Sequence, residues 1–64
     1  MEIWWRGHRA VLEPELEAEF AGYYNASVPS IQGCLSYGRT LDETVTNIKE
    51  AIDGCLEDIE AEDE

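Results

Sequence analysis

The chain has 64 residues, which limits it to a single domain, residues 1–64, with a small core. Fifteen acidic and four basic residues give a net charge of −11, which disfavours direct nucleic-acid binding because phosphate contacts need Lys and Arg. No apolar run approaches the roughly 18 residues of a membrane span, and residues 1–6 do not form a secretory signal, so we expect a cytoplasmic protein without membrane contact.

The first predicted strand covers residues 8–14. It starts earlier, at Ile3, if Gly7 marks a bulge or a bend. Residues 1–7 are therefore either an N-terminal extension or the start of this strand. The acidic segment 15–21 either alternates as a strand or forms a hairpin loop.

The second predicted strand covers residues 22–28 and is the clearest of the three, because its side chains alternate between two faces. Residues 29–33 begin with proline and end with glycine, which is typical of a tight reversal. A short third strand then covers residues 34–37 and ends at Gly38. One face of the second strand presents Tyr24, Ala26 and Val28.

A capping box at Thr40 and Glu43 predicts the start of a helix, because each side chain can satisfy the backbone N–H of the other residue. The helix is predicted to continue through Gly54 to about residue 60, and residues 60–64 are predicted to be a frayed acidic tip. Its apolar stripe consists of Leu41, Val45, Ile48, Ile52, Cys55 and Ile59, with Leu56 beside it. The side predicted to face water consists of Thr44, Asn47, Lys49, Glu50, Asp53 and Glu57.

The composition favours neither a metal nor a cofactor. Cys34 and Cys55 lie far apart and His8 is the single histidine, whereas a zinc site needs about four ligands. In a reducing cytosol the cysteines are interpreted as small buried apolar residues, with a functional thiol or a disulfide as the alternative. The acidic charge can be interpreted in two ways: it attracts a basic protein partner, or it only keeps a small protein soluble.

Several short segments of the chain occur in the order that one known family shows. They are Gly22-Tyr23-Tyr24, Ala26-Ser27-Val28-Pro29, Gly33-Cys34, Gly38, Thr40-Leu41-Asp42-Glu43 and Asn47-Ile48-Lys49-Glu50-Ala51-Ile52. Together with Ala10-Val11-Leu12-Glu13-Pro14, they resemble the HicB-type antitoxin family over about residues 9–56.

This resemblance implies an α+β fold, a truncated ribonuclease-H-like domain in which a three-stranded antiparallel sheet packs on one C-terminal helix (βββα). It also implies a partner, a small basic HicA-type toxin that cleaves messenger RNA. Family members often carry a C-terminal DNA-binding domain, and this chain ends before one, so we expect no operator binding by this chain. Many members also place a fourth strand after the helix, beside the first. Here only the acidic tip follows, so an edge of the first strand is expected to stay unpaired.

Aromatic residues give the predicted partner or oligomer interface, which consists of Trp4, Trp5, Tyr23 and Tyr37. Two tryptophans exceed what a thin core can enclose, and an unpaired edge invites strand addition, so we expect a homodimer or a higher oligomer. The alternative is that Trp4 and Trp5 cap the chain's own core. Base stacking on Tyr23 and Tyr37 is disfavoured because basic residues are few.

No catalytic residue is predicted. The acids lie on the hairpin, the helix start and the tail rather than on the second and third strands, and His8 has no nucleophile at a recognisable spacing. Two hypotheses remain. One is an antitoxin that binds and occludes a basic toxin, and the other is an orphan oligomeric module with a regulatory or scaffolding role. A metal-dependent nuclease is a distant third.

Overall fold

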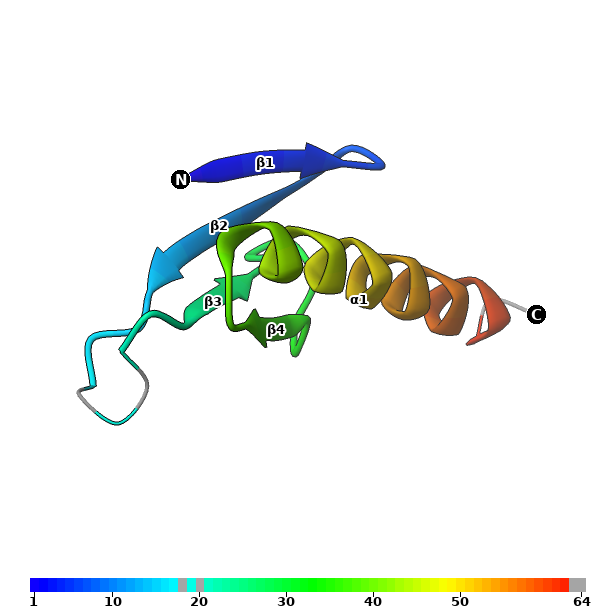
Figure 1. Ribbon diagram of the computed structural model, residues 1–64. Coiled ribbons are helices and arrows are strands. Elements are labelled where there is room, and N and C mark those ends of the chain that lie inside the picture. Colours follow the sequence, from blue (N-terminus) through cyan, green and yellow to red (C-terminus); the bar gives the residue numbers. More distant parts are fainter. Residues whose placement is uncertain (18, 20, 63–64) are drawn as a thin grey trace.

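In the computed structural model the chain forms a four-stranded antiparallel sheet followed by one helix (Figure 1). The structure describes residues 1–17, 19 and 21–62, with side chains of the helix described to residue 58. The strands lie in the order β1-β2-β3-β4, so each strand pairs with its neighbour in the sequence. The elements are β1 (Glu2–Trp5), β2 (His8–Pro14), β3 (Tyr24–Ser27), β4 (Leu35–Gly38) and α1 (Leu41–Glu62).

The α+β class and the single helix are confirmed, but the prediction of three strands is wrong. Residues 2–5 form a separate strand that pairs with β2, with Trp5 opposite His8. Arg6 and Gly7 connect the two strands with φ angles of 52° and 83°. Positive φ at both loop residues gives the tight turn whose twist matches antiparallel strands. Gly7 therefore closes a hairpin, and the edge of β2 that was expected to stay unpaired is paired with β1.

The other two strands lie where the sequence predicts them, with slightly different bounds. The reversal at residues 29–33 is confirmed, because the Val28 N–H donates to the Cys34 carbonyl at 3.1 Å and Gly33 has a φ of 79°. The described part of segment 15–21 belongs to the connection between β2 and β3 rather than to a strand. The order β2-β3-β4-α1 is the βββα order that the resemblance implies, whereas the ribonuclease-H-like fold stays a prediction.

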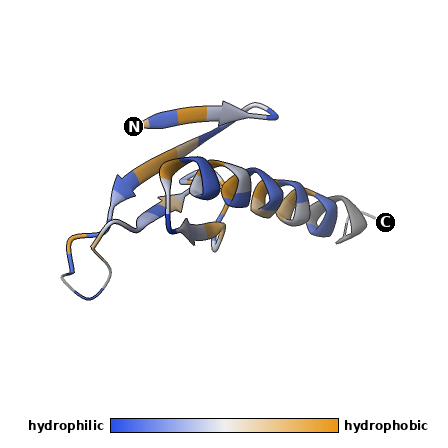
Figure 2. Ribbon diagram, in the orientation of Figure 1, coloured by the Kyte–Doolittle hydropathy of each residue, from blue (hydrophilic) through white to orange (hydrophobic). Residues whose placement is uncertain are grey.

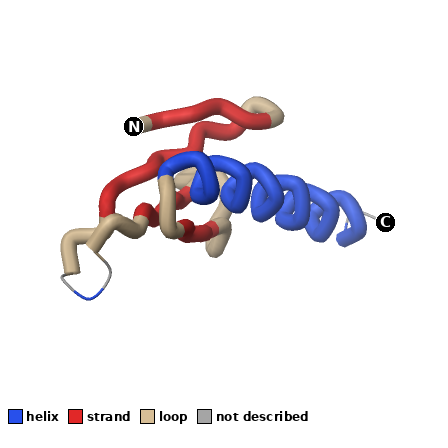
Figure 3. The backbone as a smooth tube through the Cα atoms, in the orientation of Figure 1, coloured by secondary structure: helices blue, strands red, loops and turns tan. Residues whose placement is uncertain are grey.

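The helix starts at the predicted cap, since the Glu43 N–H donates to the Thr40 hydroxyl at 3.0 Å. It ends at Glu62, two residues later than predicted. Of the predicted acidic tip, residues 60–62 continue α1 and residues 63–64 lie outside the described residues. The side chain of Ile59, which belongs to the predicted apolar stripe, is not described either. The helix lies along one face of the sheet and extends past its end (Figures 1 and 3). The molecule is therefore elongated, 44 × 19 × 17 Å.

The core lies between α1 and the covered face of the sheet. Ile48 and Ile52 of the predicted stripe are fully buried, and apolar and polar bands alternate along the helix (Figure 2). Ile31, in the loop between β3 and β4, also enters the core, which the sequence pattern did not indicate. The buried apolar residues are Ala10, Leu12, Ala26, Val28, Ile31, Cys34, Ile48 and Ile52.

Thr44 corrects the predicted polar side of the helix, because it is fully buried rather than facing water. Its hydroxyl donates to the Thr40 carbonyl at 2.8 Å, which satisfies the buried oxygen. It lies directly on Gly38, where an added Cβ would approach the Thr44 Oγ1 to 2.6 Å and its backbone nitrogen to 2.7 Å. The absence of a side chain at Gly38 therefore sets how closely α1 approaches β4.

Both cysteines are free thiols, with Cys34 buried and Cys55 half-buried against the core. Burial, reinforced by a hydrogen bond and a charge interaction with Cys55, raises the pKa of Cys34 from 9.0 to about 11. Folding thus favours the neutral thiol. Its contribution to the free energy of unfolding is complete below pH 9 and is lost as the pH rises from 9 to about 11.

We expect Cys34→Val to flatten the fall in the free energy of unfolding between about pH 9 and pH 11, because the variant cannot ionise there. Valine keeps an apolar side chain of similar size at this site. Urea unfolding of both proteins at each pH measures the difference. Equal slopes for the two proteins would show that the buried thiol does not limit stability in this range.

Candidate protein-interaction surface

One face of the sheet carries the helix and the other does not. Side chains alternate along each strand, so the neighbours of buried Ala10 and Leu12 point away from α1. Strand register brings Val11 beside Ser27, and Ser27 beside Leu35. We define the uncovered face by its apolar side chains, which are Trp4 of β1, Val11 of β2, and Leu35 and Tyr37 of β4.

The uncovered face exposes large apolar side chains. The exposed fractions are 67% for Trp4, 68% for Leu35 and 70% for Tyr37. Large apolar side chains exposed on one face of a small protein make that face a candidate binding surface. Leu35 and Val11 were not predicted for this surface, because a pattern of alternation shows that a strand has two faces and not which one a helix covers.

The structure separates the four aromatic residues predicted for the interface. Trp5 lies on the helix side, where its indole Nε1 donates to Asp53 Oδ1 at 2.9 Å and the Lys49 ammonium lies 4.8 Å from its ring centre. Its side chain therefore joins the hairpin to the helix and packs against the core, whereas the side chain of Trp4 does not. Trp4 lies on the uncovered face, at the opposite edge of the sheet from Tyr37.

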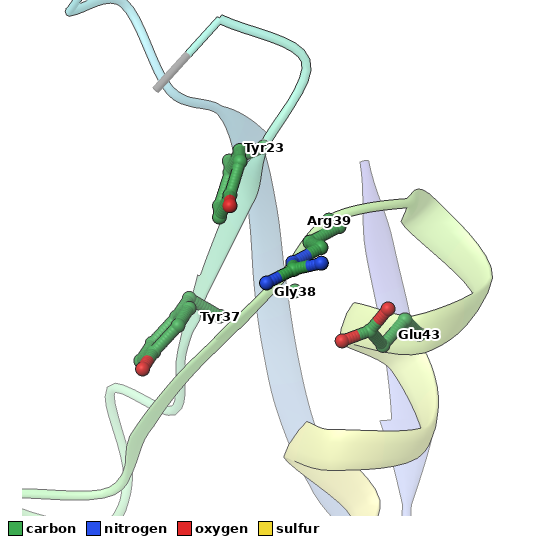
Figure 4. Close-up of a pocket in the computed structure, with 5 residues that line it drawn as sticks. All are labelled: Tyr23, Tyr37, Gly38, Arg39 and Glu43. Carbon is green, nitrogen blue, oxygen red and sulfur yellow. The ribbon is translucent and has the colours of Figure 1, made fainter. Parts of the chain in front are cut away.

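Tyr23 and Tyr37 come together at the end of the sheet where the β2–β3 connection begins. They line a hollow of about 530 Å³ with Gly38, Arg39 and Glu43. Figure 4 shows the rings of Tyr23, just before β3, and Tyr37, on β4, on one side of the view, Glu43 on the first turn of α1 on the other, and Arg39 between them. The part of the hollow that β4 contributes is held to the helix, because the Asn47 amide donates to the Tyr37 carbonyl at 2.8 Å.

A second hollow of about 350 Å³ adjoins the first and shares its two tyrosines. We call it the tyrosine pocket, and its lining residues are Glu15, Tyr23, Tyr24 and Tyr37. A third hollow of about 350 Å³ lies near Trp4 and Arg9, beside the hydrogen bond between His8 and Ser30. The uncovered face therefore has a recess at each end.

The cations of the chain are mostly engaged within it. Arg6 pairs with Asp53 at 3.3 Å and Arg9 with Glu2 at 3.0 Å, while Lys49 lies over Trp5. The surface charge is consequently set by carboxylates. Among the described residues, no three His, Cys, Asp or Glu side chains gather closely enough to hold a metal ion. Within the same residues, no helix combines the length and apolarity that crossing a membrane requires.

Comparison with known proteins identifies relatives of the chain. Residues 11–64 match the model of the HicB-like antitoxin of bacterial toxin–antitoxin systems. A UPF0150 protein of Synechocystis is 45% identical over 47 residues, which cover 73% of this chain and 68% of the relative. A UPF0150 protein of Helicobacter pylori is 44% identical over 48 residues, which cover 75% of this chain and 65% of the relative. A UPF0150 protein of Thermoplasma acidophilum is 42% identical over 43 residues, which cover 67% of this chain and 62% of the relative. The chain thus spans about two thirds of the length of these relatives. No solved structure shows significant similarity.

Proposed function

Because the chain belongs to the HicB-like antitoxin family of bacterial toxin–antitoxin systems, we propose that it binds and occludes a small basic toxin of the HicA type. Such toxins cleave messenger RNA, so occlusion of the toxin would protect the transcripts of the cell. The observation that carries this proposal is the uncovered face, which offers exposed aromatic and aliphatic side chains on a chain of net charge −11.

The net charge and the exposed apolar side chains support this partner in different ways. A net charge of −11 attracts a basic protein over a distance and accelerates its encounter. Leu35 and Tyr37 then supply the apolar anchors that hold a complex together once water is excluded. The acidic chain competes with RNA for the basic toxin surface without any chemistry of its own, so the proposed role is non-catalytic and involves no direct contact with nucleic acid.

The experiment that tests this proposal uses the small basic protein encoded beside this chain, if the genome provides one. The two proteins are produced together, and the complex is isolated through a tag on the toxin. Growth of cells that express the toxin alone or with this chain is measured in parallel. Co-purification and restored growth support the proposal. Production of both proteins without association and without restored growth contradicts it.

Leu35→Lys is expected to weaken toxin binding at least about tenfold, because the new ammonium group would be buried against a basic partner without a counter-charge. Leu35 is exposed in the free chain, so the fold tolerates the change. Thr46→Lys is the matched control, since it adds the same side chain and the same charge at an exposed position of α1. Calorimetric titration measures both. Equal losses for the two variants would place the toxin elsewhere.

A second candidate is an orphan oligomeric module with a regulatory or scaffolding role, which the exposure of Trp4 favours. In this proposal two copies cover each other's uncovered faces. Self-association brings together two chains of net charge −11, which opposes the contact at low salt. Light scattering tests the expected oligomer: multiples of 7.2 kDa at moderate protein concentration support self-association, and a 7.2 kDa species contradicts it.

A further inference from the structure

Among the described residues, the tyrosine pocket gathers the three tyrosines of the chain around a single carboxylate, that of Glu15. Tyr24 is the first residue of β3 and Tyr23 precedes it, Tyr37 lies on β4, and Glu15 is the residue after β2. The 2.9 Å hydrogen bond from the Glu15 N–H to the Tyr23 carbonyl continues the β2–β3 ladder and brings these segments together. Residues far apart in the sequence thus form one recess as a consequence of strand pairing.

Hydrogen bonds from three donors orient the carboxylate of Glu15. Its Oε1 accepts from the Leu16 N–H at 3.0 Å and the Glu17 N–H at 3.4 Å, and its Oε2 accepts from the Asn25 amide at 3.4 Å. Glu15 is half-buried, unlike the exposed Glu13 and Glu17 around it. A negative charge that is already oriented loses little conformational freedom when a cation binds beside it.

Tyrosine rings attract cations through the negative charge of their faces, and a neighbouring carboxylate strengthens that attraction. The chain already uses this chemistry within itself, where the ammonium of Lys49 lies 4.8 Å from the Trp5 ring centre. Arg39 lines the adjoining hollow and is not among the residues that line the tyrosine pocket. A volume of about 350 Å³ is at the small end of ligand sites, so it suits one side chain rather than a cofactor.

We propose that the tyrosine pocket binds one arginine or lysine side chain of the basic protein partner, with Glu15 as its counter-charge. The identity of that partner rests on the proposed function, whereas the chemistry of the pocket does not. The pocket adjoins the uncovered face through Tyr37, so a cationic side chain in the pocket would position a partner that covers Leu35. The pocket therefore supplies a specific contact beside a broad apolar one.

The test uses isolated side chains as probes. Nα-acetyl-arginine amide and Nα-acetyl-lysine amide are titrated into the ¹⁵N-labelled chain, and amide chemical shifts are followed by NMR. The neutral counterparts are the amides of Nα-acetyl-citrulline and Nα-acetyl-norleucine, which keep the shape without the charge. We expect the cationic probes to shift the resonances of Glu15, Tyr23, Tyr24 and Tyr37 and to bind at least about tenfold more tightly than the neutral ones.

Two conservative variants separate the roles of charge and ring. Glu15→Gln keeps the size and an oxygen acceptor, and Tyr37→Leu keeps apolar bulk without the aromatic face. Each is expected to lower the affinity for the cationic probes at least about fivefold while leaving the neutral probes unchanged. Equal binding of charged and neutral probes, or no response of these four resonances, would overturn the inference. If the probes fail to bind but the toxin still co-purifies, the proposed function stands and only the pocket inference fails. If the probes bind but no toxin associates, the pocket inference stands and only the identity of the partner fails.

Discussion

Ile48→Ala is expected to leave most of the chain unfolded at 25 °C. Ile48 is fully buried where α1 meets the sheet, and truncating such a residue typically costs about 2–5 kcal/mol of stability. The core of a chain this small rarely supplies more than roughly 3–5 kcal/mol in total. The expected loss is therefore comparable with the whole free energy of unfolding.

Urea unfolding followed by far-ultraviolet circular dichroism measures this loss. Ile3→Ala is the matched control, because it makes the same substitution at a half-buried position of β1. The control is expected to remain folded with a smaller decrease in the transition midpoint. An Ile48→Ala protein with the midpoint of the wild type would show that the helix does not contribute the main core contact.

Gly38→Ala is expected to have the second largest effect. The added Cβ would lie 2.6 Å from the Thr44 hydroxyl, 2.7 Å from its backbone nitrogen and 3.0 Å from its Cα. Thr44 cannot move away easily, because it is buried and its hydroxyl is bonded to the Thr40 carbonyl in the first turn of the helix. Overpacking of this kind costs about 1–3 kcal/mol, and more when the backbone itself has to shift.

Gly54→Ala provides a control with the opposite expected sign. Gly54 lies in α1 with nothing within 4 Å of an added Cβ, and alanine is favoured over glycine in a helix by about 1 kcal/mol. The same chemical change should therefore lower the midpoint at Gly38 and raise it at Gly54, as thermal or urea unfolding measures. A stabilised Gly38→Ala protein would contradict the close approach of α1 to β4.

The sequence predicted the parts of the fold that rest on local rules. The capping box at Thr40 and Glu43 fixes the helix start, and the apolar stripe identifies Ile48 and Ile52 as core residues. Long-range packing decided the parts that were missed. The Arg6-Gly7 turn is a weaker hairpin signal than Asn-Gly, so the sequence pattern does not separate β1 from β2. Thr44 is polar by composition, but it is buried because glycine opposite it leaves room.

The candidate surface was predictable only in part. Tyr23 and Tyr37 are predicted interface residues, and they line common hollows because β3 pairs with β4. Trp4 and Trp5 could not be distinguished from sequence, since adjacent residues of a strand point to opposite faces and the position of the helix decides which one is covered. Glu15 gave no signal among its acidic neighbours, because its hydrogen bonds depend on how the loop folds.

A solved structure of this chain bound to a small basic toxin of the HicA type tests the central claim most directly. We expect Trp4, Leu35 and Tyr37 to lose their exposure to the partner while Thr46 and Glu50 on α1 stay in water. A complex that covers the outer side of the helix and leaves Leu35 and Tyr37 exposed would contradict the assignment of the sheet face as the binding surface.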